Sequence, residues 1–123
     1  MLNVHIEDLP EGVSVVALTG ELDVGTVRRM EGALMEQILQ RPGVLIDLGG
    51  LTFIDSSGIG ALIQACRGAN GTPVKVVVGE GTQVARVFEI AGVGEAVDVF
   101  TDREEALAAL AAMVGRANAD SGD

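Results

Sequence analysis

Residues 44–66 have the sequence VLIDLGGLTFIDSSGIGALIQAC, in which one kind of pattern gives way to another. Residues 44–48 form a short, nearly continuous aliphatic run, which is typical of a strand covered on both faces in a parallel sheet. Further along, apolar residues recur at the spacing of one face of a helix: Ile59, Leu62, Ile63 and Cys66. The stretch therefore predicts a central strand, followed by a helix that begins near Ser56 or Ser57 and buries its cysteine.

Similar patterns on either side predict the remaining strands. Apolar and polar residues alternate over residues 2–7, which indicates a half-buried strand at the edge of a sheet. Turn residues at 9–12 join it to a second strand over residues 13–19, so that the two strands form a hairpin. Two later strands are expected over residues 74–78 and 97–100.

Three more helices are predicted from apolar residues at helical spacing. The first ends at Pro42-Gly43, and the second ends at Gly92 and Gly94. The last opens with Thr101-Asp102-Arg103-Glu104, which has the Thr-x-x-Glu form of a capping box. The expected inward residues are Val27, Met30, Leu34, Ile38, Val84, Val87, Phe88, Ala91, Leu107, Leu110 and Val114.

Strands that alternate with helices in this way are typical of an α/β domain with right-handed crossovers. We therefore expect one domain over residues 1–115, with a mixed, mostly parallel sheet of about five strands, an N-terminal hairpin and about four helices. A chain of 123 residues is long enough for one ordinary core. Residues 116–123 are small and polar, and we expect them to form a disordered tail.

The composition excludes several classes of function. Eighteen acidic and eight basic residues give a formal net charge of -10, which repels nucleic acid backbones and anionic membrane surfaces. The chain has no Trp or Tyr, so aromatic stacking is not its mode of recognition. A single cysteine has no internal disulfide partner, and no basic leader or long apolar run is present. We therefore expect a cytoplasmic protein that uses no metal or cofactor and binds neither nucleic acid nor membranes directly.

Polar loops follow three of the predicted strands, at residues 19–23, 51–57 and 79–82. Because the loops after parallel strands emerge at the same edge of a sheet, we expect these loops to converge. In the middle loop, Asp55, Ser56 and Ser57 stand at the start of a helix, where such side chains cap unpaired backbone amides. One cap does not use every hydroxyl, so a serine is left as a phosphate acceptor or as a nucleophile.

Enzymatic uses of this loop are disfavoured. A serine hydrolase needs a histidine base, but the only histidine is His5 on the first strand, and the Gly-x-Ser-x-Gly motif is absent. The glycines of the loop offer backbone amides to a phosphate, yet neither common phosphate-binding loop motif is present. Glu21, Asp23 and Asp55 would also repel a nucleotide unless a cation bridged them. A small nucleotide-binding or hydrolytic protein is the enzymatic alternative.

Three segments, taken together with their spacing, form a recognisable pattern: Leu18-Thr19-Gly20-Glu21-Leu22-Asp23, Leu45-Ile46-Asp47-Leu48 and Leu51-Thr52-Phe53-Ile54-Asp55-Ser56-Ser57-Gly58-Ile59-Gly60. Together they resemble the STAS domain of bacterial anti-sigma factor antagonists, which are also called anti-anti-sigma factors. Residues 87–93 and 104–107 look like later landmarks of the same family. The resemblance covers residues 4–114 and implies a single STAS domain.

The resemblance implies a binding switch rather than an enzyme. In that family, an anti-sigma factor that is itself a Ser/Thr kinase phosphorylates the first serine after the aspartate, which by position is Ser56, with Ser57 as the alternative. The unphosphorylated protein binds the anti-sigma factor and frees the sigma factor. Phosphorylation ends this binding, and a protein phosphatase resets the switch.

The resemblance also implies a set of partner-binding residues: Glu21, Asp23, Asp55, Ser56, Ser57, Gly58 and Ile59. With the family in view, Ser57 is expected to cap the helix, Ser56 to be exposed, and Asp23 to lie beside Ser56 across the sheet edge. The free protein is expected to be a monomer. The alternative within the same fold is a STAS subunit of a lipid transporter or of a stress-signalling scaffold.

Overall fold

The computed structural model describes residues 1–121, and the surroundings of the side chains of residues 1–116. Within this range, strands and helices alternate after an initial hairpin, which confirms the predicted α/β class. The elements are β1 Leu2–Asp8, β2 Val13–Leu22, α1 Val27–Gln40, β3 Gly43–Ile54, α2 Ser56–Arg67, β4 Val74–Val78, α3 Gln83–Ala91, the 3-10 helix η1 Val93–Glu95, β5 Val99–Phe100 and α4 Arg103–Ser121.

The strands form one five-stranded sheet in the order β1-β2-β3-β4-β5. β1 pairs antiparallel with β2 and lies at one edge, whereas β2, β3, β4 and β5 are parallel to one another. β3 is therefore central, as its aliphatic run predicted. The N-terminal hairpin and the mostly parallel sheet are both confirmed.

β3 is longer than the sequence pattern indicated. It continues past Gly49-Gly50 to Ile54, although the predicted strand stopped at Leu48. A Cβ atom on Gly50 would lie 2.8 Å from Cγ2 of Thr19, so the glycine lets β2 and β3 approach closely instead of ending the strand. Irregular register in β2 accompanies this close approach. The extension carries the chain to the edge of the sheet where α2 begins.

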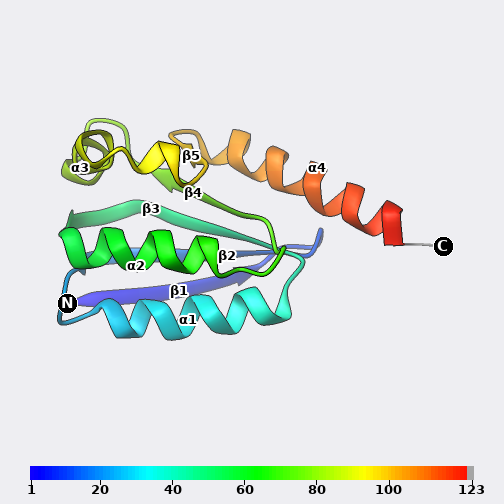
Figure 1. Ribbon diagram of the computed structural model, residues 1–123, viewed down its shortest axis with the longest axis horizontal. Coiled ribbons are helices and arrows are strands. Elements are labelled where there is room, and N and C mark those ends of the chain that lie inside the picture. The colour runs from blue at the N-terminus through cyan, green and yellow to red at the C-terminus, as the bar shows by residue number, and fades with distance from the viewer. Residues whose placement is uncertain (122–123) are drawn as a thin grey trace.

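Helices cover both faces of the sheet. Alternate residues of β3 point to opposite faces: Ile46 packs in a cluster with α1, α2 and α3, whereas Leu45 packs against α4. Figure 1 shows α1 and α2 running side by side along one face, with α4 on the other side of the sheet. The predicted inward residues Met30, Leu34 and Phe88 are buried, whereas Ala91, also predicted to point inward, is exposed at the end of α3.

The first turn of α4 is held by side chains that the sequence reading did not assign. The helix begins at Arg103, and Oδ1 of Asp102 accepts a hydrogen bond of 2.9 Å from the amide of Glu104. The prediction that Thr101 opens a capping box is therefore wrong, because the aspartate one residue later stands directly before the first helical residue. Arg103 also binds Asp47 on β3 at 2.9 Å and Glu7 on β1 at 3.2 Å.

α4 extends beyond the predicted domain boundary at residue 115. It continues to Ser121, so residues 116–121 are helical where a disordered tail was expected. Alanine, which occupies positions 117 and 119, has the highest helix propensity and favours this extension. The last two residues of the expected tail, 122–123, lie outside the described residues. Among the described residues, no helix combines the length and the apolar character that crossing a membrane requires.

Candidate functional site

The three predicted loops meet at the carboxyl ends of β2, β3 and β4. The amide of Asp55 donates to the carbonyl oxygen of Leu22 at 3.3 Å, which joins the first two loops. The side-chain amide of Gln83, at the start of α3, joins the third loop to them. Its Oε1 accepts from the amide of Ile54 at 3.2 Å, and its Nε2 donates to the carbonyl oxygen of Ile54 at 3.4 Å. The predicted convergence is confirmed.

The start of α2 is capped by Asp55. This residue has extended backbone angles, and its Oδ1 accepts a hydrogen bond of 3.0 Å from the amide of Gly58. The prediction that Ser57 caps the helix is wrong. Because α2 already begins at Ser56, both serines lie inside its first turn, and only the residue before them has the extended conformation that a cap requires.

The aspartate cap leaves both serines available. Ser56 and Ser57 are exposed, and their hydroxyls make no hydrogen bond to any residue whose side chain is described. The helix N-terminus that carries them is an environment that favours negative charge, because its amides and the helix dipole point toward it. The predicted exposure of Ser56 is confirmed, but Ser57 is exposed as well.

Gly58 and Ile59, which follow the serines, lie beneath the surface. A Cβ atom on Gly58 would lie 2.9 Å from the carbonyl oxygen of Leu22 and 2.9 Å from side-chain atoms of Leu22 and Ile54. Ile59 is 8% exposed and belongs to the core. These two residues therefore fix how closely α2 approaches the ends of β2 and β3, and present little side-chain surface to a partner.

The acidic loop after β2 is held mainly by its own hydrogen bonds. Oδ1 of Asp23 accepts from the amide of Gly25 at 2.9 Å, and Oγ1 of Thr26 accepts from the amide of Asp23 at 3.0 Å. The hydroxyl of Thr26 in turn donates to the carbonyl oxygen of Glu21 at 2.9 Å. The carboxylate of Glu21 pairs with the terminal amine of Met1 at 3.0 Å. Asp23 therefore shapes the loop, whereas Glu21 and the loop tip face solvent.

Two exposed apolar side chains lie on or next to the loops that carry Asp23 and the serines, and the sequence analysis did not assign them to the site. Val24, next to Asp23, is 75% exposed, and Phe53, two residues before the cap, is 40% exposed. Residue 53 pairs with Glu21 in the sheet register, so both apolar residues lie on the same pair of loops. The sequence did contain a signal for the exposure of Val24, because this apolar residue directly follows the polar Gly-Glu-Leu-Asp segment. Exposed apolar groups beside hydroxyls and carboxylates suit a protein-binding surface.

The single histidine and the single cysteine of the chain lie away from the serines. His5 lies in the middle of β1, opposite Ala17 in the register, and makes no hydrogen bond to the described serines. Among the described residues, no group of three or more His, Cys, Asp or Glu side chains is arranged to hold a metal ion. Cys66 is half-buried on α2, and burial, reinforced by the charge of Asp98, raises the pKa of its thiol to about 11. The thiol is therefore protonated at neutral pH.

The chain is similar in sequence and in fold to known proteins of one family. The family model of the STAS domain matches residues 8–106. The anti-sigma-F factor antagonist RsfB of Mycobacterium tuberculosis is 31% identical over 98 residues, which are 78% of this chain and 80% of the relative. A crystal structure of an anti-sigma factor antagonist from Mycobacterium paratuberculosis superposes with a TM-score of 0.81 at 26% identity, covering 89% of this chain and 94% of that one. The anti-sigma factor antagonist SpoIIAA in its unphosphorylated form superposes with a TM-score of 0.66 at 27% identity, covering 85% and 93%.

Proposed function

Because the chain belongs to the STAS domain family, we propose that it is an anti-sigma factor antagonist, a protein that binds an anti-sigma factor and thereby frees a sigma factor. Its partner is an anti-sigma factor with Ser/Thr kinase activity, which phosphorylates Ser56 and so ends the binding. A protein phosphatase restores the unphosphorylated form. In this role the chain is a cytoplasmic kinase substrate and a binding switch, not an enzyme.

The exposed hydroxyls at the start of α2 are the observation that carries this proposal. Asp55 accepts the hydrogen bond from the Gly58 amide, so the fold does not need a serine hydroxyl at this helix start. Ser56 is the first residue of the helix and is exposed, which gives a kinase access to its Oγ. A phosphate there is tolerated by the folded protein, because anions at helix N-termini are favoured by about 0.3–1 kcal/mol.

The same phosphate weakens binding to a partner. It adds about 1.5 to 2 negative charges and three strong acceptor oxygens to a surface that already carries Glu21, Asp23 and Asp55. A partner carboxylate at about 5 Å would be repelled by about 3 kcal/mol per unit charge at an effective dielectric constant of about 20. Because about 1.4 kcal/mol corresponds to a factor of ten, one such contact lowers the affinity more than a hundredfold. Release therefore needs no change of fold.

Phosphosite mapping tests the proposal. The protein is incubated with ATP and purified anti-sigma factor kinases, and the modified residue is identified by mass spectrometry. We expect one phosphate on Ser56 of the wild-type protein and of Ser57→Ala, and none on Ser56→Ala. Because both serines are exposed and neither is the cap, the two alanine variants are closely matched in their effect on stability. A phosphate that stays in place in Ser56→Ala would overturn the assignment of Ser56.

A further inference from the structure

A pocket in the surface lies beside β5, which forms one edge of the sheet. α3, η1 and β5 enclose a pocket of about 640 Å³. Small-molecule sites in proteins have volumes of roughly 300 to 1,000 Å³, so this pocket is large enough for a small organic ligand. The loops at residues 19–23 and 51–57 contribute no residue to it, whereas Glu80 and Gly81 of the third loop, at residues 79–82, line it. The pocket therefore does not include the serines of the proposed switch, but it adjoins the switch surface through this third loop.

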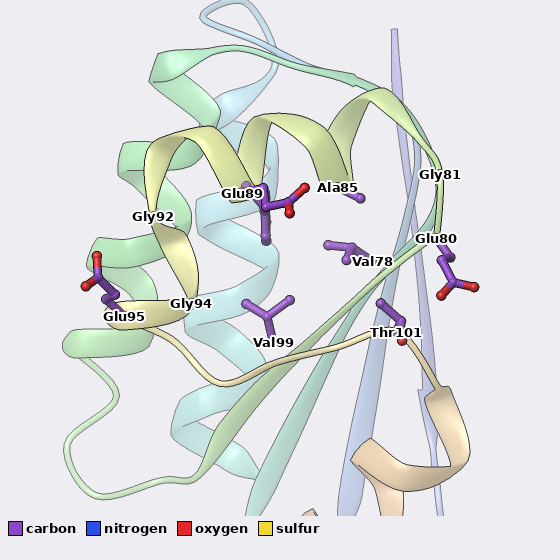
Figure 2. A pocket seen from close by; sticks show the side chains of 11 residues that line it. Val78, Glu80, Gly81, Ala85, Glu89, Gly92, Gly94, Glu95, Val99 and Thr101 are labelled. Carbon is purple, nitrogen blue, oxygen red and sulfur yellow. The ribbon is translucent and has the colours of Figure 1, made fainter.

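The inner wall of the pocket is apolar. Val78 from β4 and Phe88 from α3 are buried, and Ala85 and Val99 are partly buried beside them. Figure 2 shows Val78, Ala85 and Val99 lying around the space between α3 and the chain segment that follows η1. An apolar body of a ligand would displace water from these side chains, which stabilises a complex by roughly 25 cal/mol per Å² of buried apolar surface.

Three carboxylates stand around this apolar wall. Figure 2 shows Glu89 over the middle of the pocket, with Glu80 and Glu95 toward its opposite ends. All three residues are exposed, and none is hydrogen-bonded or ion-paired through its side chain to a residue whose side chain the structure describes. No Lys, Arg or His lines the pocket, all of whose lining residues are described. The local charge is therefore negative only.

A glycine at the mouth of the pocket, Gly94, leaves the entrance open, although the fold does not need a glycine there. Gly94 lines the pocket, and a Cβ atom built on it would meet no heavy atom within 4 Å. Its backbone is not in the positive-φ region that favours glycine. Neither packing nor backbone geometry therefore accounts for a glycine here, and the missing side chain leaves the mouth of the pocket clear beside Glu95.

We propose that this pocket binds a small organic cation, an amine or guanidine carried on an apolar body. The apolar wall accepts the body, and the Glu89 carboxylate over the middle of the pocket accepts the charged head, while Glu80 and Glu95 add to the negative potential at its ends. A phosphate or carboxylate ligand would meet only negative charge, and a neutral ligand would gain only the apolar contact. One exposed ion pair contributes about 0.2–1 kcal/mol, so it favours a cation over its neutral analogue by about 1.4- to fivefold.

Titrations followed by two-dimensional NMR test this assignment. The probes are 2-phenylethylammonium, 2-phenylethanol and 3-phenylpropionate, which share an aromatic body and differ in charge. We expect the ammonium probe to bind more tightly than the alcohol, to shift the backbone amides of Val78, Phe88 and Val99, and to bind more weakly at high salt. The carboxylate probe is expected not to bind. If the ammonium probe leaves these amides unshifted, or if the carboxylate binds as tightly, the proposal is wrong.

Matched charge variants separate the pocket from the overall acidity of the chain. Glu89→Gln/Glu95→Gln removes two charges at the pocket, and Glu36→Gln/Glu105→Gln removes two charges from exposed residues elsewhere. The first variant should lose the preference for the ammonium probe over the alcohol, and the second should keep it. Ala85→Leu, which fills the pocket, should abolish binding of both probes. Equal loss of the preference in the two charge variants would mean that the probe senses only the net charge, and would overturn the proposal.

Discussion

The approach of α2 to the ends of β2 and β3 depends on the missing side chain of Gly58, and replacing this glycine with alanine tests that dependence. The new Cβ atom would lie 2.9 Å from the carbonyl oxygen of Leu22, whereas ordinary contacts begin near 3.4 Å. The helix would have to move by about 0.5 Å or the strand end would have to yield, and overpacking of this kind costs about 1–3 kcal/mol.

Gly60→Ala is the matched control, because it makes the same chemical change two residues further along the same helix. A Cβ atom on Gly60 would meet no heavy atom within 4 Å, so this variant gains helix propensity, by about 0.5–1 kcal/mol, without a clash. Both variants share this gain, so the difference between their unfolding free energies isolates the steric cost at position 58. We expect Gly58→Ala to be less stable than Gly60→Ala by about 1–3 kcal/mol.

Urea titrations followed by circular dichroism give the two free energies, and the melting temperature provides a second readout. For a domain of this size, about 1 kcal/mol corresponds to a difference of about 4 °C. Equal stability of Gly58→Ala and Gly60→Ala would refute the packing argument, because the same methyl group would then cost nothing against the Leu22 carbonyl. The slope of the urea transition should stay the same in both variants, which verifies that each unfolds from the same native state.

Three further changes test other parts of the structure. Asp55→Ala removes the cap of α2 and should lower the unfolding free energy by about 1 kcal/mol in urea titrations; an unchanged value would contradict the assignment of the cap. Folding raises the pKa of Cys66 from 9.0 to about 11, so its contribution to stability is complete below pH 9.0 and disappears as the pH rises through 11. Cys66→Ala should lack this pH dependence in denaturation curves, and native Cys66 should react slowly with iodoacetamide at neutral pH. Val24→Ser should weaken binding to an anti-sigma factor about tenfold in calorimetric titrations, whereas Leu39→Ser, which is 73% exposed on α1, should leave the affinity unchanged; similar losses in both would show that Val24 is not part of the interface.

The sequence predicts the order of the elements and the inward faces of the helices because hydrophobic periodicity reports burial directly. The aliphatic run at residues 44–48 indicated the central strand, and Met30 and Leu34 indicated the buried face of α1. The length of β3 was not predicted. A glycine pair reads as a strand end in the sequence, and only the neighbouring strand, with Thr19 against Gly50, shows that these glycines permit close contact.

The position of the candidate site could be predicted from the sequence, but the structural role of each of its residues, as a helix cap or as an exposed side chain, could not. Convergence of the loops follows from the rule that parallel strands share one carboxyl edge. The identity of the capping residue does not follow from this rule. Ser, Thr and Asp are all good caps, and the position at which the helix begins determines which of them acts as the cap. At both α2 and α4 the structure gives this task to an aspartate, Asp55 and Asp102, whereas the sequence reading chose Ser57 and Thr101. The exposure of Val24 and Phe53 depends on which side of the loops the rest of the fold leaves uncovered. Hydrophobic periodicity does not predict this for segments as short as these.

The affinity of the anti-sigma factor kinase for the two phosphorylation states of this protein tests the proposed switch most directly. Unphosphorylated protein and protein carrying one phosphate on Ser56 are titrated separately into the purified kinase by calorimetry, at the same ionic strength. We expect tight binding of the unphosphorylated form and an affinity at least about a hundredfold lower for the phosphorylated form. Equal affinity of the two forms would contradict the charge-based switch at the start of α2.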